Sequence, residues 1–429
     1  MWIVNVGLKS KIYQFFLLII FKIVYQFFFL TYSVIYNIDL DISIGKVIAG
    51  WSVYLLYIGL ATFKVKDMFY SVGIIFLILT CVVSTISLYE MEDILLYDFF
   101  KALMYWFLVL FGFIIYQKKS SDKSIFHLLE INQLQYLLFY VSAIFTLIMS
   151  GIYAGFRITL SLDEVYTYRL EMRMASMPAI VNYLFYFFGG TIIPYCFAFF
   201  LAYKKRLYAI SSLFLGIMIF SINGMKTWLL VYALILGVFV GFGLNNKKIN
   251  LYIIGGFILL TVGSIYLYSN KEDINLMAIL GRVYYIPSRI GYNYIDFFDK
   301  NEFLYLRESI LKFFFDSPYP VHSAFYIVDG AGSDVSTSRA NNGLWGDAYG
   351  NFGIVGMLVY PFMLCYIMSL LKRSMRGMDP RLVTSIVILA LWISVNSSFF
   401  VWLITGGVLL LLFINEVTVK SYRKDVGDI

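Results

Sequence analysis

Charged residues are scarce in this chain: Asp, Glu, Lys and Arg together make up only 14% of its 429 residues. Hydrophobic residues make up 61% and aromatic residues 20%. A soluble domain covers its surface with roughly 25% charged residues, so this composition excludes one and indicates a chain that is solvated by lipid. The formal charge of +7 is dispersed among connecting segments, which argues against a nucleic-acid partner.

Cysteines and motifs for soluble cofactors are also lacking. Cys81, Cys196 and Cys365 each lie inside an apolar run, so we expect apolar filler rather than disulfides or a metal cluster. No phosphate-binding loop, HExxH metal site, GxSxG elbow or dinucleotide fingerprint occurs. We therefore expect no cofactor and no metal, and a donor that is already activated on a lipid fits better than a soluble nucleotide.

Long apolar runs fill most of the chain. A bilayer core needs roughly 20 apolar helical residues, and the first run is expected to be a span rather than a cleaved leader. This pattern predicts an all-α polytopic membrane protein with about 12 transmembrane helices in a single integral membrane domain, 1–429. The predicted spans are Tyr13–Tyr36, Ile44–Phe63, Tyr70–Leu88, Phe99–Tyr116, Tyr136–Ala154, Ile180–Tyr203, Leu207–Ile222, Trp228–Leu244, Leu251–Tyr268, Phe352–Leu371, Leu382–Val395 and Phe399–Asn415.

The connections between these spans alternate in charge. Lys/Arg clusters fall on every second connection, and acidic or sparsely charged turns lie between them. The positive-inside rule places the basic clusters, and with them both termini, in the cytoplasm. The third outside loop is then 156–178. The fifth is a large, partly helical periplasmic loop, 269–351, in which Phe303–Phe315 has the pattern of an amphipathic helix.

The type of cation differs between the two predicted sides. The cytoplasmic connections hold 14 Lys and 5 Arg, whereas the two large outside loops hold 7 Arg and 3 Lys. Arginine grips phosphate oxygens with a planar fork of donors, so this excess predicts an anionic ligand, a lipid diphosphate, at the outer face. Some of these arginines could instead pair with acids or touch lipid headgroups. The candidates are Arg157, Arg169, Arg173, Arg282, Arg289, Arg307 and Arg339, joined by Lys226 between two spans.

Three other residues could act as a base. His322 follows SPYP in the large loop, and its imidazole could take up a proton or contact phosphate. Asp334 and Asp347 lie in the Gly-rich stretch of the same loop and could accept a proton from a sugar hydroxyl. Each has an ordinary alternative: a surface or hydrogen-bonded histidine, and turn-capping aspartates.

Three stretches carry a resemblance to a known family. They are YTYRLEMRMAS (Tyr166–Ser176), GRVYYIPSRIGYNYIDFF (Gly281–Phe298) and RANNGLWGDAYGNFGIVGM (Arg339–Met357), in which Gly350 stands eleven positions after Arg339. With the topology of the whole chain, these stretches resemble the Wzy-type oligosaccharide repeat-unit polymerases, the O-antigen and capsule polymerases of bacterial envelopes.

The resemblance implies a metal-independent glycosyltransferase of polysaccharide and lipopolysaccharide biosynthesis in the bacterial inner membrane. Such an enzyme moves a glycan from one undecaprenyl-diphosphate carrier onto another carrier-linked repeat unit. Its expected partners are the undecaprenyl-diphosphate-linked donor and acceptor, membrane lipid and a chain-length-regulating protein. Arg169, Arg173, Arg282 and Arg289 are the expected diphosphate ligands, with Arg157 and Arg339 second.

Other functions stay open at this point. An O-antigen ligase uses the same donor with a lipid A–core acceptor. A flippase for the lipid-linked unit also has about a dozen spans, but short outside loops are expected of it. A membrane O-acetyltransferase is a weaker alternative, because it needs a reactive histidine placed for an acyl donor.

Overall fold

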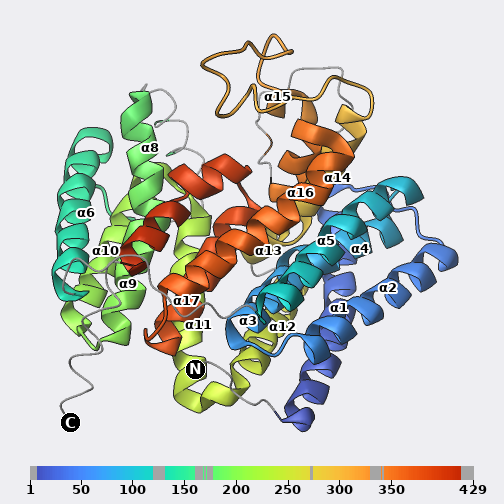
Figure 1. Cartoon of the computed structure of the whole chain (residues 1–429), viewed down its shortest axis with the longest axis horizontal. Coiled ribbons are helices and arrows are strands. Elements are labelled where there is room, and N and C mark those ends of the chain that lie inside the picture. Colours follow the sequence, from blue (N-terminus) through green and yellow to red (C-terminus); the bar gives the residue numbers. More distant parts are fainter. Residues whose placement is uncertain are drawn as a thin grey trace. The chain divides into compact units, whose positions relative to one another are not determined.

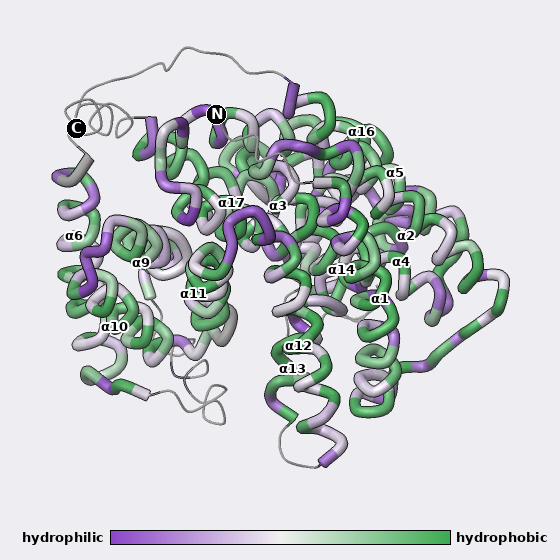
Figure 2. The backbone as a smooth tube through the Cα atoms, turned by 90° about the horizontal axis from the view of Figure 1, so that it is seen from below, coloured by the Kyte–Doolittle hydropathy of each residue, from purple (hydrophilic) through white to green (hydrophobic). Residues whose placement is uncertain are grey.

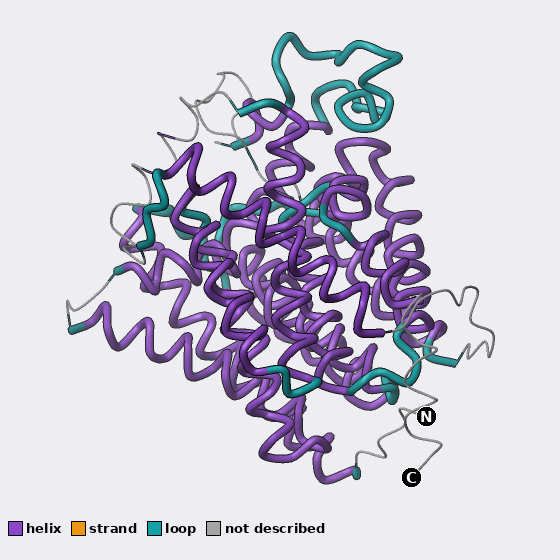
Figure 3. The backbone as a smooth tube through the Cα atoms, turned by 90° about the vertical axis from the view of Figure 1, so that its left-hand side faces the viewer, coloured by secondary structure: helices purple, strands orange, loops and turns teal. Residues whose placement is uncertain are grey.

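The computed structural model describes residues 7–118, 131–159, 168, 171, 177–270, 274–328, 340 and 343–416, without the side chains of 131, 132, 179, 226 and 227. Helices account for almost all of the regular structure, and no strand occurs among these residues (Figure 3). The all-α fold class is therefore confirmed. The helices are coloured as hydrophobic along most of their length, and hydrophilic residues gather at their ends and connections (Figure 2).

The chain forms two compact units, which are described separately. Unit 1 comprises 1–120, 245–369 and 394–400; unit 2 comprises 121–244, 370–393 and 401–429. The helices of unit 1 are α1 (Leu8–Tyr36), α2 (Ile44–Lys64), α3 (Met68–Leu77), the π-helix η1 (Ile78–Val82), α4 (Val83–Met91), α5 (Leu96–Tyr116), η3 (Asn246–Lys248), α12 (Ile249–Ser269), α13 (Asn275–Val283), α14 (Tyr285–Phe298), α15 (Ala324–Ile327) and α16 (Leu344–Ser374), whose last residues belong to unit 2 (Figure 1).

Unit 2 contains the remaining helices. They are α6 (Ile131–Ala154), α8 (Ala179–Phe187), η2 (Phe188–Ile192), α9 (Ile193–Ala202), α10 (Arg206–Asn223), α11 (Lys226–Asn245), α17 (Pro380–Val395) and η4 (Val401–Thr405). α10 packs against α9 and α6. Arg381 joins the start of α17 to the end of α9, because its guanidinium donates to the Ala202 carbonyl at 3.0 Å.

The prediction of twelve spans is not confirmed. Among the described residues, nine helical stretches are long and apolar enough to cross a membrane, which makes the chain a multi-pass membrane protein. Two predicted spans fall within one stretch, Trp228–Ser269, whose 42 residues are counted once. The helix at Pro380–Val395 is too short at 16 residues, and the last predicted span is interrupted after η4 at Gly406 and Gly407, the latter with a positive φ of 76°.

The central helix of unit 1 is the continuous stretch Met68–Met91, which comprises α3, η1 and α4 and is buried along its whole apolar window. α2, α5, α12 and α14 all pack against parts of it. Small residues near its end, such as Ser84, Thr85 and Ser87, are fully buried. Small side chains allow helix backbones to approach closely within a membrane, and this explains how so many helices surround one stretch.

The loop 269–351 is partly helical, as predicted, but its helices are not where the pattern placed one. Phe303–Phe315 forms consecutive turns rather than an amphipathic helix. Tyr305 and Leu306 adopt positive φ angles of 48° and 65°, which a right-handed helix cannot contain. The helices of this loop are α13, α14, α15 and the start of α16, which begins eight residues before the predicted Phe352.

Candidate functional site

α13 and α14 fold back against the membrane-spanning helices instead of standing clear of them. The Tyr284 hydroxyl, at the junction of the two helices, lies 3.0 Å from the hydroxyl of Thr261 in α12. Thr261 is eight residues before the end of α12, a distance of about 12 Å along the helix axis. The helix pair therefore folds back along α12, and we call it the re-entrant arm of unit 1 for this path.

Hydroxyl groups hold α14 against the start of α4. Ser288 is hydrogen-bonded to Ser84, and its hydroxyl donates to the Cys81 carbonyl at 3.3 Å. Tyr292 donates to the Thr85 carbonyl at 2.9 Å. The turn between α13 and α14 is fixed by sequence, because Pro287 lacks a backbone N–H and is accommodated in the first turn of a helix.

Two of the predicted arginines lie on this arm. Arg282 is in the last turn of α13, and Arg289 is near the start of α14. Arg282 is partly exposed and has no hydrogen-bond or ion-pair partner among the described residues. Arg289 is 36% exposed, and its Nη1 lies 3.1 Å from Oε2 of Glu92, which is 5% exposed. Both guanidinium groups thus keep donors available to an anion.

Tyr285 lies between the two arginines in sequence and packs on the end of α1. Its ring centroid is 5.4 Å from that of Phe29 and 5.3 Å from that of Tyr32. Burial and the neighbouring Glu92 raise the pKa of Tyr285, and its phenol is hydrogen-bonded to the Glu92 carboxylate. The phenol is therefore neutral and engaged with Glu92, and the donors that the arm leaves to a ligand are those of the two arginines.

Glu92 is the acidic residue of this cluster. Its Oε1 atom is buried without a hydrogen-bond partner. Burial raises the pKa of Glu92, and both the positive charge of Arg289 and a hydrogen bond from Tyr285 oppose that rise. The ion pair is consequently incomplete on both sides, with one unpartnered carboxylate oxygen and a partly exposed guanidinium.

His322 belongs to a second cluster, on the turns that follow α14. Its Nδ1 lies 3.1 Å from Oε2 of Glu308 and accepts the Ala324 N–H at 3.2 Å. Glu308 is 7% exposed and also accepts from the Ser323 N–H at 2.8 Å and from Ser317 at 2.9 Å. A buried carboxylate and a backbone N–H thus fix the position of an imidazole that is itself 31% exposed.

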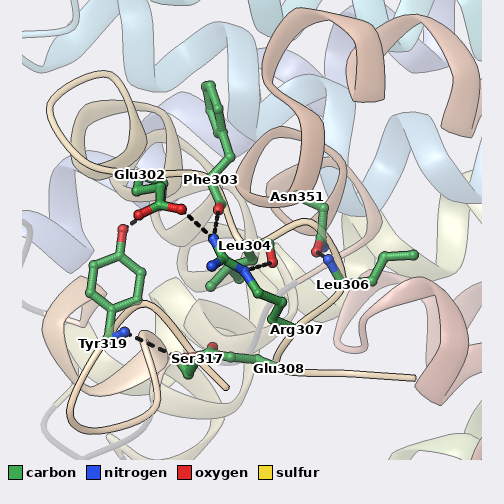
Figure 4. Close-up of polar contacts among 9 residues, drawn as sticks. All are labelled: Glu302, Phe303, Leu304, Leu306, Arg307, Glu308, Ser317, Tyr319 and Asn351. Carbon is green, nitrogen blue, oxygen red and sulfur yellow. Dashed lines mark hydrogen bonds and ion pairs between the residues drawn. The ribbon is translucent and has the colours of Figure 1, made fainter. Parts of the chain in front are cut away.

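The turns that carry Glu308 are fixed by Arg307. This guanidinium binds Glu302 at 2.5 Å and the Phe303 and Leu304 carbonyls at 3.0 Å (Figure 4). Tyr319 donates to the Glu302 carbonyl at 2.5 Å. Arg307 is therefore occupied with its own loop, which distinguishes it from Arg282 and Arg289.

The far end of α14 is tied to α5 by a buried lysine. Lys101, which is 3% exposed, lies 2.5 Å from Asp299 and 3.1 Å from Asp98, and Tyr349 donates to Asp299. Asn293, in the middle of α14, donates to the Ile327 carbonyl at 3.1 Å and so joins α15 to α14. Both clusters, the arginine arm and the His322 turns, are therefore carried by α14.

Asp347 lies in the first turn of α16 and is 5% exposed. One carboxylate oxygen accepts from Asn351 at 3.0 Å and the other from the Phe399 N–H at 2.9 Å. The carboxylate thus caps the start of the segment at Phe399, and this engagement makes it a poor proton acceptor for an external hydroxyl.

The predicted residues of the other outside loop fall in unit 2 or outside the described residues. Arg157 is in unit 2, where it pairs with Glu171 at 2.9 Å and lies 3.8 Å from the Tyr168 ring centroid. Lys226 begins α11, and its side chain is outside the described part. Arg169, Arg173, Asp334 and Arg339 lie entirely outside the described residues.

Sequence reasoning missed three acidic and basic residues of these clusters. Glu92 was interpreted only as a mark of an outside turn, Glu308 only as a possible ion-pair partner, and Lys101 not at all. The EMED turn directly after an apolar run could have drawn attention to Glu92, since a carboxylate at the end of a span needs a cation nearby. No local signal links Glu308 with His322, 14 residues further on.

Comparison with known protein families, curated proteins and solved structures gives no match to this chain. The evidence for a function therefore lies in the residues of the chain. No group of three or more His, Cys, Asp or Glu side chains that could hold a metal ion occurs among the described residues. What the described part offers is a re-entrant arm with two available guanidinium groups and an imidazole oriented by a carboxylate.

Proposed function

We propose that this protein polymerises undecaprenyl-diphosphate-linked oligosaccharide repeat units at the outer face of the bacterial inner membrane. The observation that supports the proposal is the placement of Arg282 and Arg289 on the re-entrant arm, where Arg289 pairs with Glu92 at the end of α4. A lipid diphosphate lies at the level where apolar spans meet water, so cations at the ends of spans are at a suitable depth to bind it.

The proposed reaction is a glycosyl transfer without a metal. An acceptor sugar hydroxyl attacks the anomeric carbon of the donor; a glycosidic C–O bond forms, and the bond from that carbon to the diphosphate oxygen breaks. Negative charge grows on the departing lipid diphosphate, and preorganised Arg282 and Arg289 stabilise it. His322, oriented by Glu308, takes the proton of the attacking hydroxyl.

The remaining predicted residues complete the proposal from other segments. Arg157, Arg169, Arg173, Lys226 and Arg339 remain candidate ligands of a lipid diphosphate, and Asp334 remains a candidate base. Two lipid-linked substrates held together would supply orientation, which contributes a large part of such a barrier. A chain-length-regulating protein remains a proposed partner.

Reconstitution of the purified chain with lipid-linked repeat unit alone tests the proposal. We expect a ladder of elongated glycans without nucleotide sugar, metal or a second protein. Arg282→Ala/Arg289→Ala should abolish the ladder, whereas Lys300→Gln, which removes a cation that is 70% exposed and paired with Asp296, should leave it intact. Absence of elongation by the wild-type protein, or an intact ladder from the double arginine variant, contradicts the assignment.

The same assay separates the polymerase from a ligase. An O-antigen ligase would leave lipid-linked units at a single repeat and would transfer glycan only when lipid A–core is added. A flippase would give neither product, and would instead move the lipid-linked unit between the leaflets of a liposome.

A further inference from the structure

We infer that unit 1 contains a second anion site, a pocket for a phosphate group at the opposite ends of its helices. The pocket lies where α1, α2, α3, η3 and α12 begin or end, on the side that the charge pattern predicts to be cytoplasmic. It is a partly open space of about 410 Å³ that includes its mouth to solvent. Its position and lining are independent of the proposed glycosyl transfer.

Three lysines from three different segments line this pocket. They are Lys11 of α1, Lys66 after α2 and Lys247 of η3, and no acidic residue is among the lining residues. Asp67 adjoins Lys66 in sequence, but its carboxylate accepts from the Phe69 N–H at 3.1 Å and caps α3. Lys11 is half-buried, whereas Lys66 and Lys247 are exposed, and a bound anion would reduce the repulsion among the three like charges.

The lining also contains buried polar groups that have been removed from water. Thr62 is 2% exposed, and its hydroxyl has no hydrogen-bond partner. Asn250 donates to Ser71 at 2.8 Å and to Gln14 at 3.4 Å, while its own carbonyl oxygen has no partner. An unpaired buried hydroxyl is costly, and a bound phosphate oxygen would accept its proton while the Asn250 oxygen accepts from a lysine ammonium.

Phosphate is the anion that this lining fits. Lysine ammonium groups bind it as point charges, and they need not be arranged in the planar fork that a carboxylate or diphosphate site built from arginine requires. Basic pockets between helices at the cytoplasmic surface recognise phospholipid headgroups. The apolar residues Val65, Met68 and Ile249 of the lining are compatible with a lipid, while a soluble phosphate would use the same cations.

Native mass spectrometry of the full chain with phosphatidylglycerol or cardiolipin, against phosphatidylcholine, tests the lipid source. Calorimetric titration with inorganic phosphate and pyrophosphate tests the soluble source. We expect Lys11→Gln/Lys66→Gln/Lys247→Gln to weaken binding of the effective probe roughly 100-fold, from a factor of about 5 for each lysine. Binding of either probe with this loss supports the site and identifies its ligand source.

Two further variants make the test specific. Lys9→Gln/Lys64→Gln/Lys248→Gln removes the same charge from exposed neighbours that do not line the pocket, and it should weaken binding less than about 3-fold. Thr62→Val keeps the shape and the charge and should weaken binding several-fold without lowering the thermal stability of the empty protein. Equal losses of affinity in the two triple variants would show that the probes bind to the basic surface in general and not to this pocket, and would overturn the inference. Failure of both anionic probes to bind would overturn it as well.

Discussion

Glu90 and Glu92, two residues apart at the end of α4, contrast a closed ion pair with an open one. Glu90 is fully buried; one carboxylate oxygen lies 2.5 Å from the ammonium of Lys22, and the other accepts from Gln26 at 2.8 Å. The Lys22 ammonium also lies 4.6 Å from the Trp51 ring centroid and 4.9 Å from that of Tyr54. Every charge of this pair is compensated within the protein.

The Glu92 pair is open by comparison. One carboxylate oxygen has no partner, and Arg289 remains 36% exposed. Charges inside a membrane protein persist where they hold the fold or where they act on a ligand. The closed pair joins α1 to α4 and leaves nothing to bind with, whereas the open pair can accept an anion without breaking a complete interaction. Two ion pairs within one helical turn therefore differ in what they can do: the Lys22–Glu90 pair stabilises the fold, and the Arg289–Glu92 pair is left able to contact a ligand.

The largest effect is expected where the closed pair is broken. Lys22→Met leaves Glu90 buried without its cation, and loss of one partner of a buried pair costs about 3–5 kcal/mol. We expect a large drop in the thermal unfolding temperature of the detergent-solubilised protein, followed by tryptophan fluorescence.

The matched control removes both charges. Lys22→Met/Glu90→Gln should recover most of the lost stability, because no unpaired charge remains. A double variant as unstable as the single one would show that packing, and not charge compensation, explains the role of Lys22.

The second prediction concerns His322, which lies beside Glu308. His322→Gln should lower the elongation rate about 100-fold or more, since a general base contributes roughly 10²–10⁴-fold, while donor binding is unchanged. The readout is the single-turnover rate with the lipid-linked repeat unit. The control is Lys312→Gln on the same turns, which should keep the wild-type rate; an unchanged rate in His322→Gln would transfer the role of base to Asp334.

Much of the fold follows from the sequence because lipid imposes a simple requirement. A helix is the only single segment that satisfies its own backbone in a bilayer, so apolar runs such as Ile44–Phe63 and Phe99–Tyr116 coincide closely with α2 and α5. The count of spans was wrong near the last predicted span, where the helix ends directly after η4 at Gly406 and Gly407. Hydropathy averaged over a long run does not detect such a local break.

The site was only partly predictable, since its key interactions join distant segments. The excess of arginine predicted Arg282 and Arg289 as candidates, but Glu92, the partner of Arg289, lies nearly 200 positions before it in sequence. The re-entrant path of α13 and α14 depends on hydroxyl contacts such as Ser288 with Ser84, which no periodicity predicts. The apolar residues of Phe303–Phe315 recur at helical spacing, which predicted a helix. In the structure the Arg307 guanidinium donates to the Phe303 and Leu304 carbonyls, and the segment forms turns.

A third, smaller effect tests whether charge or geometry matters at the open pair. Arg289→Lys keeps the positive charge but loses the planar fork of donors. We expect about 10-fold weaker binding of the lipid-linked donor, compared with roughly 100-fold for Arg289→Ala. Competition binding with purified donor measures both. Equal losses for the two variants would show that the fork itself is essential, and equal wild-type affinities would exclude Arg289 from the diphosphate site.

The smallest expected effect is a change in pH dependence through Glu92. Because burial raises its pKa in the folded protein, the stability that it contributes is present at acid pH and is lost as the pH rises through that raised value. Above it, the carboxylate is charged and competes with a ligand for Arg289. Glu92→Gln should therefore bind pyrophosphate several-fold more tightly than wild type at pH 7.5, and equally at a pH below the pKa of Glu92. Titration of both proteins at each pH cancels the effect of protonation of the probe itself. A difference in affinity that is constant across pH would mean that Glu92 acts through shape and not through its charge.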